Sequence, residues 1–225
     1  MIYDTETTGL PAPNSYWKDW SNCRLIQIAW IIIDSKYNII SQHSYLISST
    51  KPFTDNNQIN PINPIYEEFI KKYGQYDRKI DEFNCSTEAF KLHGISDEFR
   101  NENGVSFIEM IYNFIKDVMK CKWIINHSTY FDIGVVLNEC KLRKISTNWI
   151  NNKTFADTKL SEHYVHNHSL FDTVKNIGCD VNNFEIEVKP HDALYDTMLC
   201  YLLFRNSKDK RKMIRDARKV LSMLL

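Results

Sequence analysis

The chain has 225 residues with equal numbers of acidic and basic side chains, 28 of each, so its formal net charge is zero. This length fits one domain with a sizeable core, and a neutral chain has no global field that draws it onto nucleic acid. Six scattered cysteines without a C-x-x-C pair argue against a zinc ribbon and against a disulfide-stapled secreted module. The longest apolar run, Ile28 to Ile33, is too short to cross a bilayer. We therefore expect a protein of the cytoplasm or another reducing intracellular compartment, with no signal peptide and no membrane partner.

The first part of the chain predicts meandering strands. Residues 1–4 are predicted to form a short strand that runs into a turn at Thr8–Gly9. Residues 25–34 are β-branched and aromatic almost throughout, which is typical of a strand buried on both faces. Clearer alternation over 41–48, after a turn at 36–38, predicts the hairpin partner of that strand.

Residues 49–85 differ in character, because prolines stand there among Asn, Asp and Lys. A short helix is predicted at 66–73. The segment is too short and too polar to bury a core of its own. We interpret it as an insertion on a single domain that spans residues 1–225.

From Ser86 onward the pattern is helical, and Ser86 itself is a residue typical of a helix N-cap. Residues 106–119 place their apolar side chains along one face, which predicts an amphipathic helix. The remaining predicted elements are a strand at 121–126, a helix at 131–142, a strand at 154–158, helices at 169–177 and 192–204, and a basic C-terminal helix at 206–225. Strand hairpins followed by alternating helices and strands predict an α/β fold layered around a mixed sheet.

Four acidic residues and one histidine, far apart in the sequence, stand at the edges of these elements. Asp4 and Glu6 stand where the chain leaves the first strand, and Asp132 follows the strand at 121–126. His191 and Asp196 lie about one helical turn apart at the last long helix. Such folds bind ligands at the ends of neighbouring strands, and carboxylate oxygens are ligands for Mg²⁺ or Mn²⁺. The set therefore predicts a two-metal site that cleaves phosphodiesters with one nearby base.

Each of these acids also has an ordinary structural explanation when it is taken alone. Asp4 can cap a helix while Glu6 is solvated, and Asp132 can simply favour a helix N-terminus. Two residues apart on an extended segment, however, Asp4 and Glu6 point to the same face, which is unfavourable in a sheet interior without a cation. Asp192 is predicted to be a helix cap. The ordered set, more than any one member, supports the metal site.

In chain order, these residues and their neighbours resemble the motifs of the DEDDh 3′-to-5′ exonucleases, a family related to the proofreading subunit of the bacterial replicative polymerase. The resemblance runs from Met1 to about Phe204. The segments that carry it are Asp4-Thr-Glu-Thr-Thr-Gly-Leu-Pro11, Arg24-Leu-Ile-Gln-Ile-Ala-Trp30, His93-Gly-Ile-Ser96, His127 to Asp132, Asp157-Thr158, and His191 to Asp196. One position departs from the pattern, because Ser128 stands where the family usually has Asn.

The resemblance implies an RNase H-like fold, with a mixed five-stranded sheet flanked by helices. It implies that Asp4, Glu6 and Asp196 bind one divalent ion, Mg²⁺ or Mn²⁺. Asp4 would bridge to a second ion, which Asp132 would reach directly or through water. His191 would take the proton from the attacking water, and nucleoside 5′-monophosphates would leave from the 3′ end. The residues implied to seat the substrate are Thr8, Gly9, Leu10, His93 and His127.

The expected function is therefore metal-dependent 3′-to-5′ exonuclease activity on single-stranded or 3′-ended nucleic acid. DNA is favoured over RNA, in proofreading or end processing, with a polymerase as a further partner. An exoribonuclease of the same family is the first alternative, since the core motifs do not read the 2′-hydroxyl. The second is a non-catalytic module that binds nucleic acid or a polymerase, which the intact acidic set argues against.

Three other groups of side chains have both a functional and a structural interpretation. The histidines at 163–168 either bind zinc or lie in a surface loop, and they lack a suitably spaced cysteine. The basic stretch 208–219 either steers nucleic acid or is a solvated helix face. Trp17 and Trp20 are candidates for stacking on bases.

Overall fold

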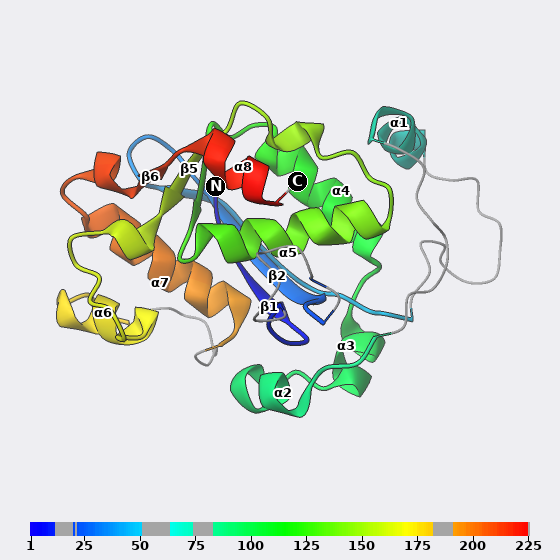
Figure 1. The fold of residues 1–225 in the computed structure, drawn as a ribbon, viewed down its shortest axis with the longest axis horizontal. Helices are drawn as coiled ribbons and strands as arrows, with labels where there is room; N and C mark the ends of the chain where they lie inside the picture. The colour runs from blue at the N-terminus through cyan, green and yellow to red at the C-terminus, as the bar shows by residue number, and fades with distance from the viewer. Residues whose placement is uncertain (12–19, 21, 51–63, 74–82, 182–190, 225) are drawn as a thin grey trace.

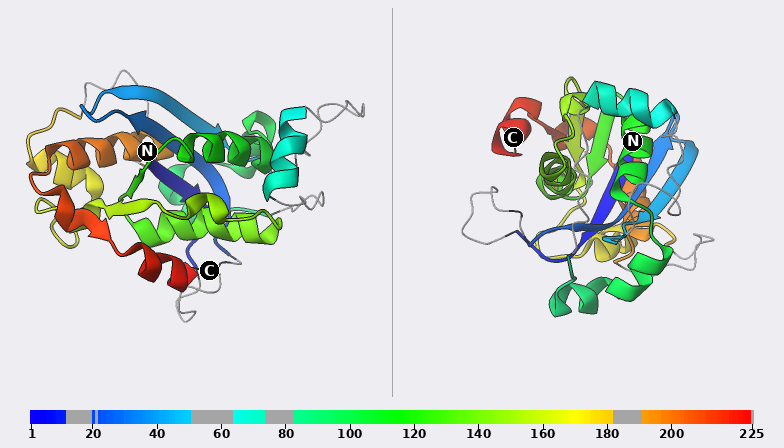
Figure 2. Two further views of the ribbon diagram at one scale, coloured as in Figure 1. Left: turned by 90° about the horizontal axis from the view of Figure 1, so that it is seen from above. Right: turned by 90° about the vertical axis from the view of Figure 1, so that its right-hand side faces the viewer.

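The computed structural model of the chain describes residues 1–11, 20, 22–50, 64–73, 83–181 and 191–224. A six-stranded mixed sheet runs through the molecule in the order β3-β2-β1-β4-β5-β6, and helices cover both of its faces (Figures 1 and 2). This confirms the predicted α/β class with a mixed sheet between helices. The sheet has one strand more than the five that were predicted.

Strand pairing follows the chain order on one side of β1 and crosses over on the other. The strands are β1 (Ile2–Thr7), β2 (Leu25–Ile33), β3 (Ile39–Leu46), β4 (Trp123–Asn126), β5 (Thr154–Asp157) and β6 (Ile214–Arg215). The pairs β1–β2, β2–β3 and β5–β6 are antiparallel, whereas β1–β4 and β4–β5 are parallel. The carboxyl ends of β1, β4 and β5 therefore meet at one edge of the sheet.

The predicted helices are present, and a separate short helix, α3, follows α2. Their bounds are α1 (Pro64–Tyr73), α2 (Thr87–His93), α3 (Asp97–Asn103), α4 (Phe107–Val118), α5 (Thr129–Leu142), α6 (Leu170–Asn176), α7 (Ala193–Asn206) and α8 (Ala217–Leu224). Ser86 caps α2 as predicted, because its hydroxyl accepts the Ala89 N–H at 3.1 Å.

The C-terminal range 206–225 is not one helix. A 3₁₀ turn at Lys210–Met213 leads into the two-residue strand β6, and the α-helix begins only at Ala217. Arg215 on β6 donates to the Asp157 carboxylate at 2.8 Å. This contact and the pairing with β5 hold the segment extended. The short strand β6 is the extra strand of the sheet.

The two faces of β1 meet different helices. Tyr3 packs edge-on against Phe114 of α4, with ring centroids 5.1 Å apart, on the side that α5 also covers. Ile2 packs on the other side with Met198 of α7. Because side chains alternate along a strand, Asp4 and Glu6 share the face of Ile2. Both acids are therefore directed toward the side of the sheet on which α7 lies.

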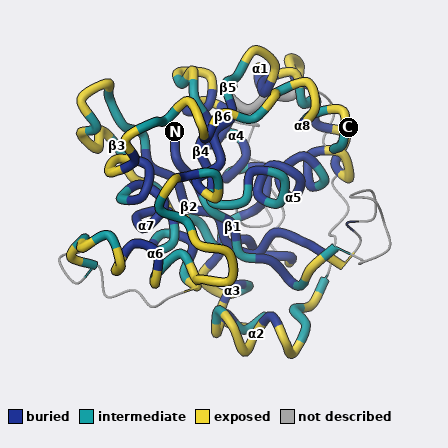
Figure 3. Tube along the Cα trace, turned by 60° about the vertical axis from the view of Figure 1, so that its left-hand side comes forward, coloured by how far each residue is buried: buried dark blue, intermediate teal, exposed yellow. Residues whose placement is uncertain are grey.

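Strand β2 is buried on both faces, as its composition predicts. Trp30 lies in the core on the α4 side and Ile31 in the core on the α7 side. Trp30 is fully buried, and its indole N–H donates to Asp117 at 3.1 Å. Figure 3 shows that buried segments concentrate in the sheet and in α5, whereas α2 is largely exposed.

All six cysteines are free thiols. Within the described ranges, no helix is long and apolar enough to cross a membrane.

Candidate active site

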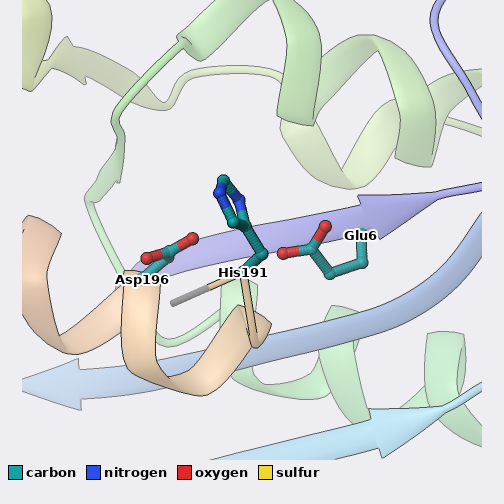
Figure 4. Close-up of side chains that lie close together, drawn as sticks. All are labelled: Glu6, His191 and Asp196. Atoms are coloured by element: carbon teal, nitrogen blue, oxygen red, sulfur yellow. The ribbon is translucent and has the colours of Figure 1, made fainter. Parts of the chain in front are cut away.

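Three of the predicted site residues converge beside β1. One ligand atom from each of Glu6, His191 and Asp196 lies within 4.8 Å of the others. Glu6 comes from β1, His191 from the segment just before α7, and Asp196 from the first turn of α7. Figure 4 shows the two carboxylates on either side of the His191 ring. Residues 185 positions apart in the chain, from Glu6 to His191, thus form one cluster.

Asp4 and Asp132 belong to the same electrostatic environment. Burial raises the pKa of Asp4 well above its usual value, and the charges of Asp132, Asp196 and Glu6 raise it further. The pKa of Glu6 is raised to about 9, first by burial and then by Asp196 and Asp132. The charges of Asp132 and Asp196 therefore oppose the ionisation of both Asp4 and Glu6.

The pKa values of the other two acids of this cluster, Asp132 and Asp196, are raised less. Burial raises the pKa of Asp132 to about 7, although a hydrogen bond of 2.9 Å from the Thr5 hydroxyl favours its ionised form. Burial also raises the pKa of Asp196 to about 6, against the opposing effect of His191. At neutral pH Asp196 is therefore mostly ionised and Asp132 about half ionised, and a nearby cation would favour the ionised form of both.

The donor set fits a hard divalent cation. Buried like charges are unfavourable without a compensating cation. In the protein without a bound cation, this unfavourable burial of like charges is seen in the raised pKa values of the acids.

His191 lies outside the helix, which corrects the expectation that it shares a helical face with Asp196. Its backbone is left-handed, with φ of 65°, and it immediately precedes the N-cap of α7. That cap is Asp192, as predicted, and its carboxylate accepts the N–H groups of Leu194 and Tyr195. The left-handed turn brings His191 back beside Asp196, although five positions separate them in the chain.

Gln27 is a supporting residue that the sequence did not single out. Its amide donates to Asp192 at 3.0 Å and accepts the N–H of Ala193 at 3.1 Å. These bonds join β2 to the first residues of α7 and so position His191. The available signal was a glutamine in an otherwise apolar buried strand.

A second supporting contact fixes α5, the helix that carries Asp132. Glu139 is buried and accepts the Nε–H of Arg24 at 2.8 Å and the N–H of Leu25 at 3.0 Å. Arg143, one turn further along α5, also donates to Glu139. The sequence shows only an i,i+4 pair here, because Arg24 lies 115 positions from Glu139.

In the turn after β1, the Thr8 hydroxyl forms hydrogen bonds with the protein's own backbone. The Thr8 hydroxyl donates to the Asn22 carbonyl at 2.9 Å and accepts the Arg24 N–H at 3.0 Å. A Cβ at Gly9 would lie 3.2 Å from the same carbonyl, so the turn is tight there. Leu10, by contrast, is 76% exposed. Of these three predicted substrate residues, Leu10 has the side chain that is free for a ligand.

His93 lies next to the acidic cluster. Burial lowers its pKa, a backbone hydrogen bond with Thr7 opposes this, and the charge of His191 lowers it further. Its Nδ1 accepts the Ile95 N–H at 3.0 Å, and its Nε2 lies 3.4 Å from the Cys85 thiol. The interactions with Thr7 and His191 thus place His93 beside the acidic cluster.

His127 is held differently. Its Nδ1 lies 2.8 Å from the Thr158 hydroxyl, and its ring packs edge-on against Tyr164. Burial lowers the pKa of His127 to about 3, so the ring is neutral at physiological pH. Thr158 and Tyr164, its hydrogen-bond and ring partners, belong to the β5 side of the site.

The unusual Ser128 begins α5 as its N-cap but makes no side-chain capping bond. Nearby Asn126 donates from its amide to the Tyr3 carbonyl at 2.8 Å and thereby joins β4 to β1. Its amide oxygen is buried and has no hydrogen-bond partner among the described residues. Asn126 is thus committed to the sheet and does not replace the missing family Asn.

The lower-ranked candidates do not join this site. Trp20 is 5% exposed and packs on Gly134 of α5, so it is not available for stacking on a base. Trp17 lies outside the described residues. In the described part of the chain, none of the histidines at 163–168 belongs to a potential metal cluster, and His163 lies 3.4 Å from Glu162.

Comparisons with known proteins give a match at the level of structure. No protein-family model matches the chain, and no curated protein matches its sequence. Escherichia coli exonuclease I in complex with a dT13 oligonucleotide matches with a TM-score of 0.61 and 14% identity, over 92% of this chain and 41% of that one. Exonuclease I from Methylocaldum szegediense matches with a TM-score of 0.59 and 16% identity, over 94% and 41%.

A full-length 3′-exonuclease matches with a TM-score of 0.59 and 14% identity, over 95% of this chain and 61% of that one. The chain thus spans 41% of the length of the exonuclease I structures that it matches. At these identities the likeness shows the fold alone. The fold is RNase H-like, as predicted, and it is shared with exonuclease I.

Proposed function

We propose that the chain is a DEDDh-type, metal-dependent 3′-to-5′ exonuclease that acts on single-stranded DNA. The observation that carries this proposal is the convergence of Glu6, His191 and Asp196 within 4.8 Å, with Asp4 and Asp132 electrostatically coupled to them. The shared fold adds support, because the matched exonuclease I structures include complexes with single-stranded oligonucleotides and a zinc-bound DNA complex.

In the proposed site, Asp4, Glu6 and Asp196 hold one divalent ion, and Asp4 with Asp132 holds a second. When bound, such ions clamp the scissile phosphate and stabilise the attacking and leaving oxygens. The exposed His191 accepts the proton of the attacking water at a ring nitrogen. Its position is maintained by the capping bonds of Asp192.

Substrate seating is assigned to the turn beyond β1 and to the end of α2. The exposed Leu10 side chain contacts the terminal nucleotide, while Thr8 and Gly9 shape the turn that presents it. His93, which lies beside His191, contacts the same end of the strand. His127 contributes from the β5 side as a neutral ring.

The test is a hydrolysis assay on 3′-labelled and 5′-labelled single-stranded DNA, 3′-mispaired duplex DNA and matched RNA. We expect nucleoside 5′-monophosphates from the 3′ end with Mn²⁺ or Mg²⁺ and none with EDTA. Asp4→Asn should abolish turnover, whereas Asp172→Asn, which changes an exposed acid on α6, should not. Full turnover by purified Asp4→Asn protein would contradict the site.

The same assay decides between the remaining alternatives. Faster degradation of RNA than of DNA would make the chain an exoribonuclease, and no metal-dependent release from any substrate would favour a non-catalytic binding module. A relation to the polymerase proofreading subunit, and association with a polymerase, remain predictions from the motifs.

A further inference from the structure

A groove of about 1010 Å³ lies on the outer side of α5, between this helix, α1 and α8. These three helices occupy one side of the molecule (Figure 1). Its lining includes the apolar or aromatic side chains of Trp20, Tyr73 and Leu137. Four lysines line it, two from the end of α1 and two from the end of α5 and the turn after it: Lys71, Lys72, Lys141 and Lys144.

The charge in this groove is of one sign. All four lysines are exposed, and none of the described residues that line the groove is acidic. Within the described ranges, none of the four forms an ion pair with a carboxylate, and the Lys72 ammonium lies 5.3 Å from the centroid of the Tyr73 ring. In a chain of zero net charge, four such lysines are a marked local excess.

Two further features of the described part of the groove are an unpaired amide and an unusual backbone conformation. The amide nitrogen of Asn138, which lines the groove from α5, is buried and has no hydrogen-bond partner among the described residues. Lys144 adopts a left-handed backbone with φ of 57°, a conformation that Gly or Asn adopts more readily. The chain thus carries a cation at a turn whose backbone would favour another residue.

We propose that this groove binds the single-stranded nucleic acid upstream of the 3′ end, with its phosphates on the lysines. The proposal rests on the proposed exonuclease function. Asp132 stands in the first turn of α5 and Lys141 near its end, about 14 Å further along the helix axis at 1.5 Å per residue. A short run of nucleotides spans this distance. An acidic peptide would also meet the lysines, but the strand in the adjacent site already supplies regularly spaced phosphates.

The first test measures binding separately from hydrolysis. Fluorescence anisotropy of a labelled dT20 oligonucleotide in EDTA is followed across a salt series for the wild type and for Lys141→Ala/Lys144→Ala. We expect the dissociation constant of the double variant to rise about tenfold at low salt, and its salt slope to fall by about 1.4, since each phosphate contact on a single strand contributes about 0.7.

The matched control is Lys36→Ala/Lys116→Ala, which removes the same charge from the exposed β2–β3 turn and from α4. It should bind like the wild type. A second variant, Lys141→Arg/Lys144→Arg, should keep the wild-type slope, which separates loss of charge from loss of folding. Equal dissociation constants and slopes for the groove and control variants overturn the proposal, as does weakened binding of a polyglutamate peptide with unchanged binding of dT20.

The second test separates failure of the groove from failure of the enzyme assignment. With Mn²⁺, the Lys141→Ala/Lys144→Ala protein should show a raised KM for dT20 and an unchanged turnover of a dinucleotide, which is too short to reach the groove. If the wild type hydrolyses nothing but binds dT20 through these lysines, the proposed function is wrong and the groove stands. If it hydrolyses both substrates alike in every variant, the groove is wrong and the function stands.

Discussion

The hydroxyl of Thr5 is a small group with a defined effect on the acidic cluster. It donates to Asp132 at 2.9 Å and favours the ionised carboxylate. Thr5→Val should raise the pKa of Asp132 further and weaken divalent-ion binding about tenfold, the lower end of the range for ligand-supporting residues. The measurement is turnover against Mn²⁺ concentration.

Thr5→Ser keeps the hydroxyl and serves as the matched control. It should retain the wild-type metal requirement. A Thr5→Val protein with an unchanged metal requirement would show that this hydrogen bond does not tune the site.

Gly134 has a steric role on α5. A Cβ at this position would lie 2.3 Å from a ring carbon of Trp20, and both residues are buried. Gly134→Ala should therefore destabilise the protein by about 1–3 kcal/mol through overpacking, as measured by urea unfolding. In a Trp20→Leu background the cost of Gly134→Ala should shrink, and an equal cost in both backgrounds would refute the contact.

At the scale of elements, α5 depends on the buried carboxylate of Glu139. Burial alone would raise the pKa of Glu139, but Arg143 and Arg24 outweigh it and lower the pKa. Glu139→Gln removes the carboxylate that both guanidinium groups contact, and breaking such a buried pair costs about 3–5 kcal/mol. Urea unfolding at pH 7 measures this loss.

The same contact predicts a dependence on acid. A carboxyl whose folded pKa is depressed contributes stability above its unfolded pKa, about 4.3, and loses it as the pH falls through the folded value. Wild-type stability should therefore decline below about pH 4, and the part of this decline due to Glu139 should be absent in Glu139→Gln. Parallel acid-unfolding curves for both proteins would contradict this role.

Elements with strong local signals were predictable from the sequence. The serine caps, the apolar face of 106–119 and the β-branched run of 25–34 each act within a few residues, so the predicted helices and the buried strand are present. The strand β6 was not predictable, because two residues carry no periodicity and the contact of Arg215 with Asp157 is long-range.

The same distinction between local and long-range signals applies to the candidate site. Motif order placed Glu6, His191 and Asp196 near one another, and the geometry has them within 4.8 Å. The left-handed backbone of His191 and the bridge through Gln27 could not be foreseen, since both depend on how the start of α7 meets β2. Local pattern thus pointed to the residues of the candidate site, and tertiary contacts determined how they are held.

At the scale of the whole molecule, the acidic cluster makes stability depend on pH and on metal. The folded pKa values of Asp196, Asp132 and Glu6 are about 6, 7 and 9, above the unfolded values near 4. A raised pKa contributes stability that is complete below the unfolded value and is lost as the pH rises through the folded one. The metal-free protein should therefore melt at progressively lower temperature between about pH 5 and pH 9.

Divalent ions should reverse this trend, because they bind the ionised carboxylates. We expect Mn²⁺ to raise the melting temperature strongly at pH 8.5 and little at pH 5, relative to EDTA. Asp4→Asn should weaken both the alkaline decline and the response to Mn²⁺. A melting temperature in EDTA that does not change with pH would contradict the predicted destabilisation by the ionised acidic cluster.

The positive φ of His191 determines which substitution at this position can test its role in proton transfer. Ala is strained in that left-handed conformation, whereas Asn adopts it more readily. A loss of turnover in His191→Ala would therefore mix a missing imidazole with a displaced helix start. His191→Asn keeps the backbone bend and removes only the titrating ring, so a comparison of the two variants isolates proton transfer from architecture.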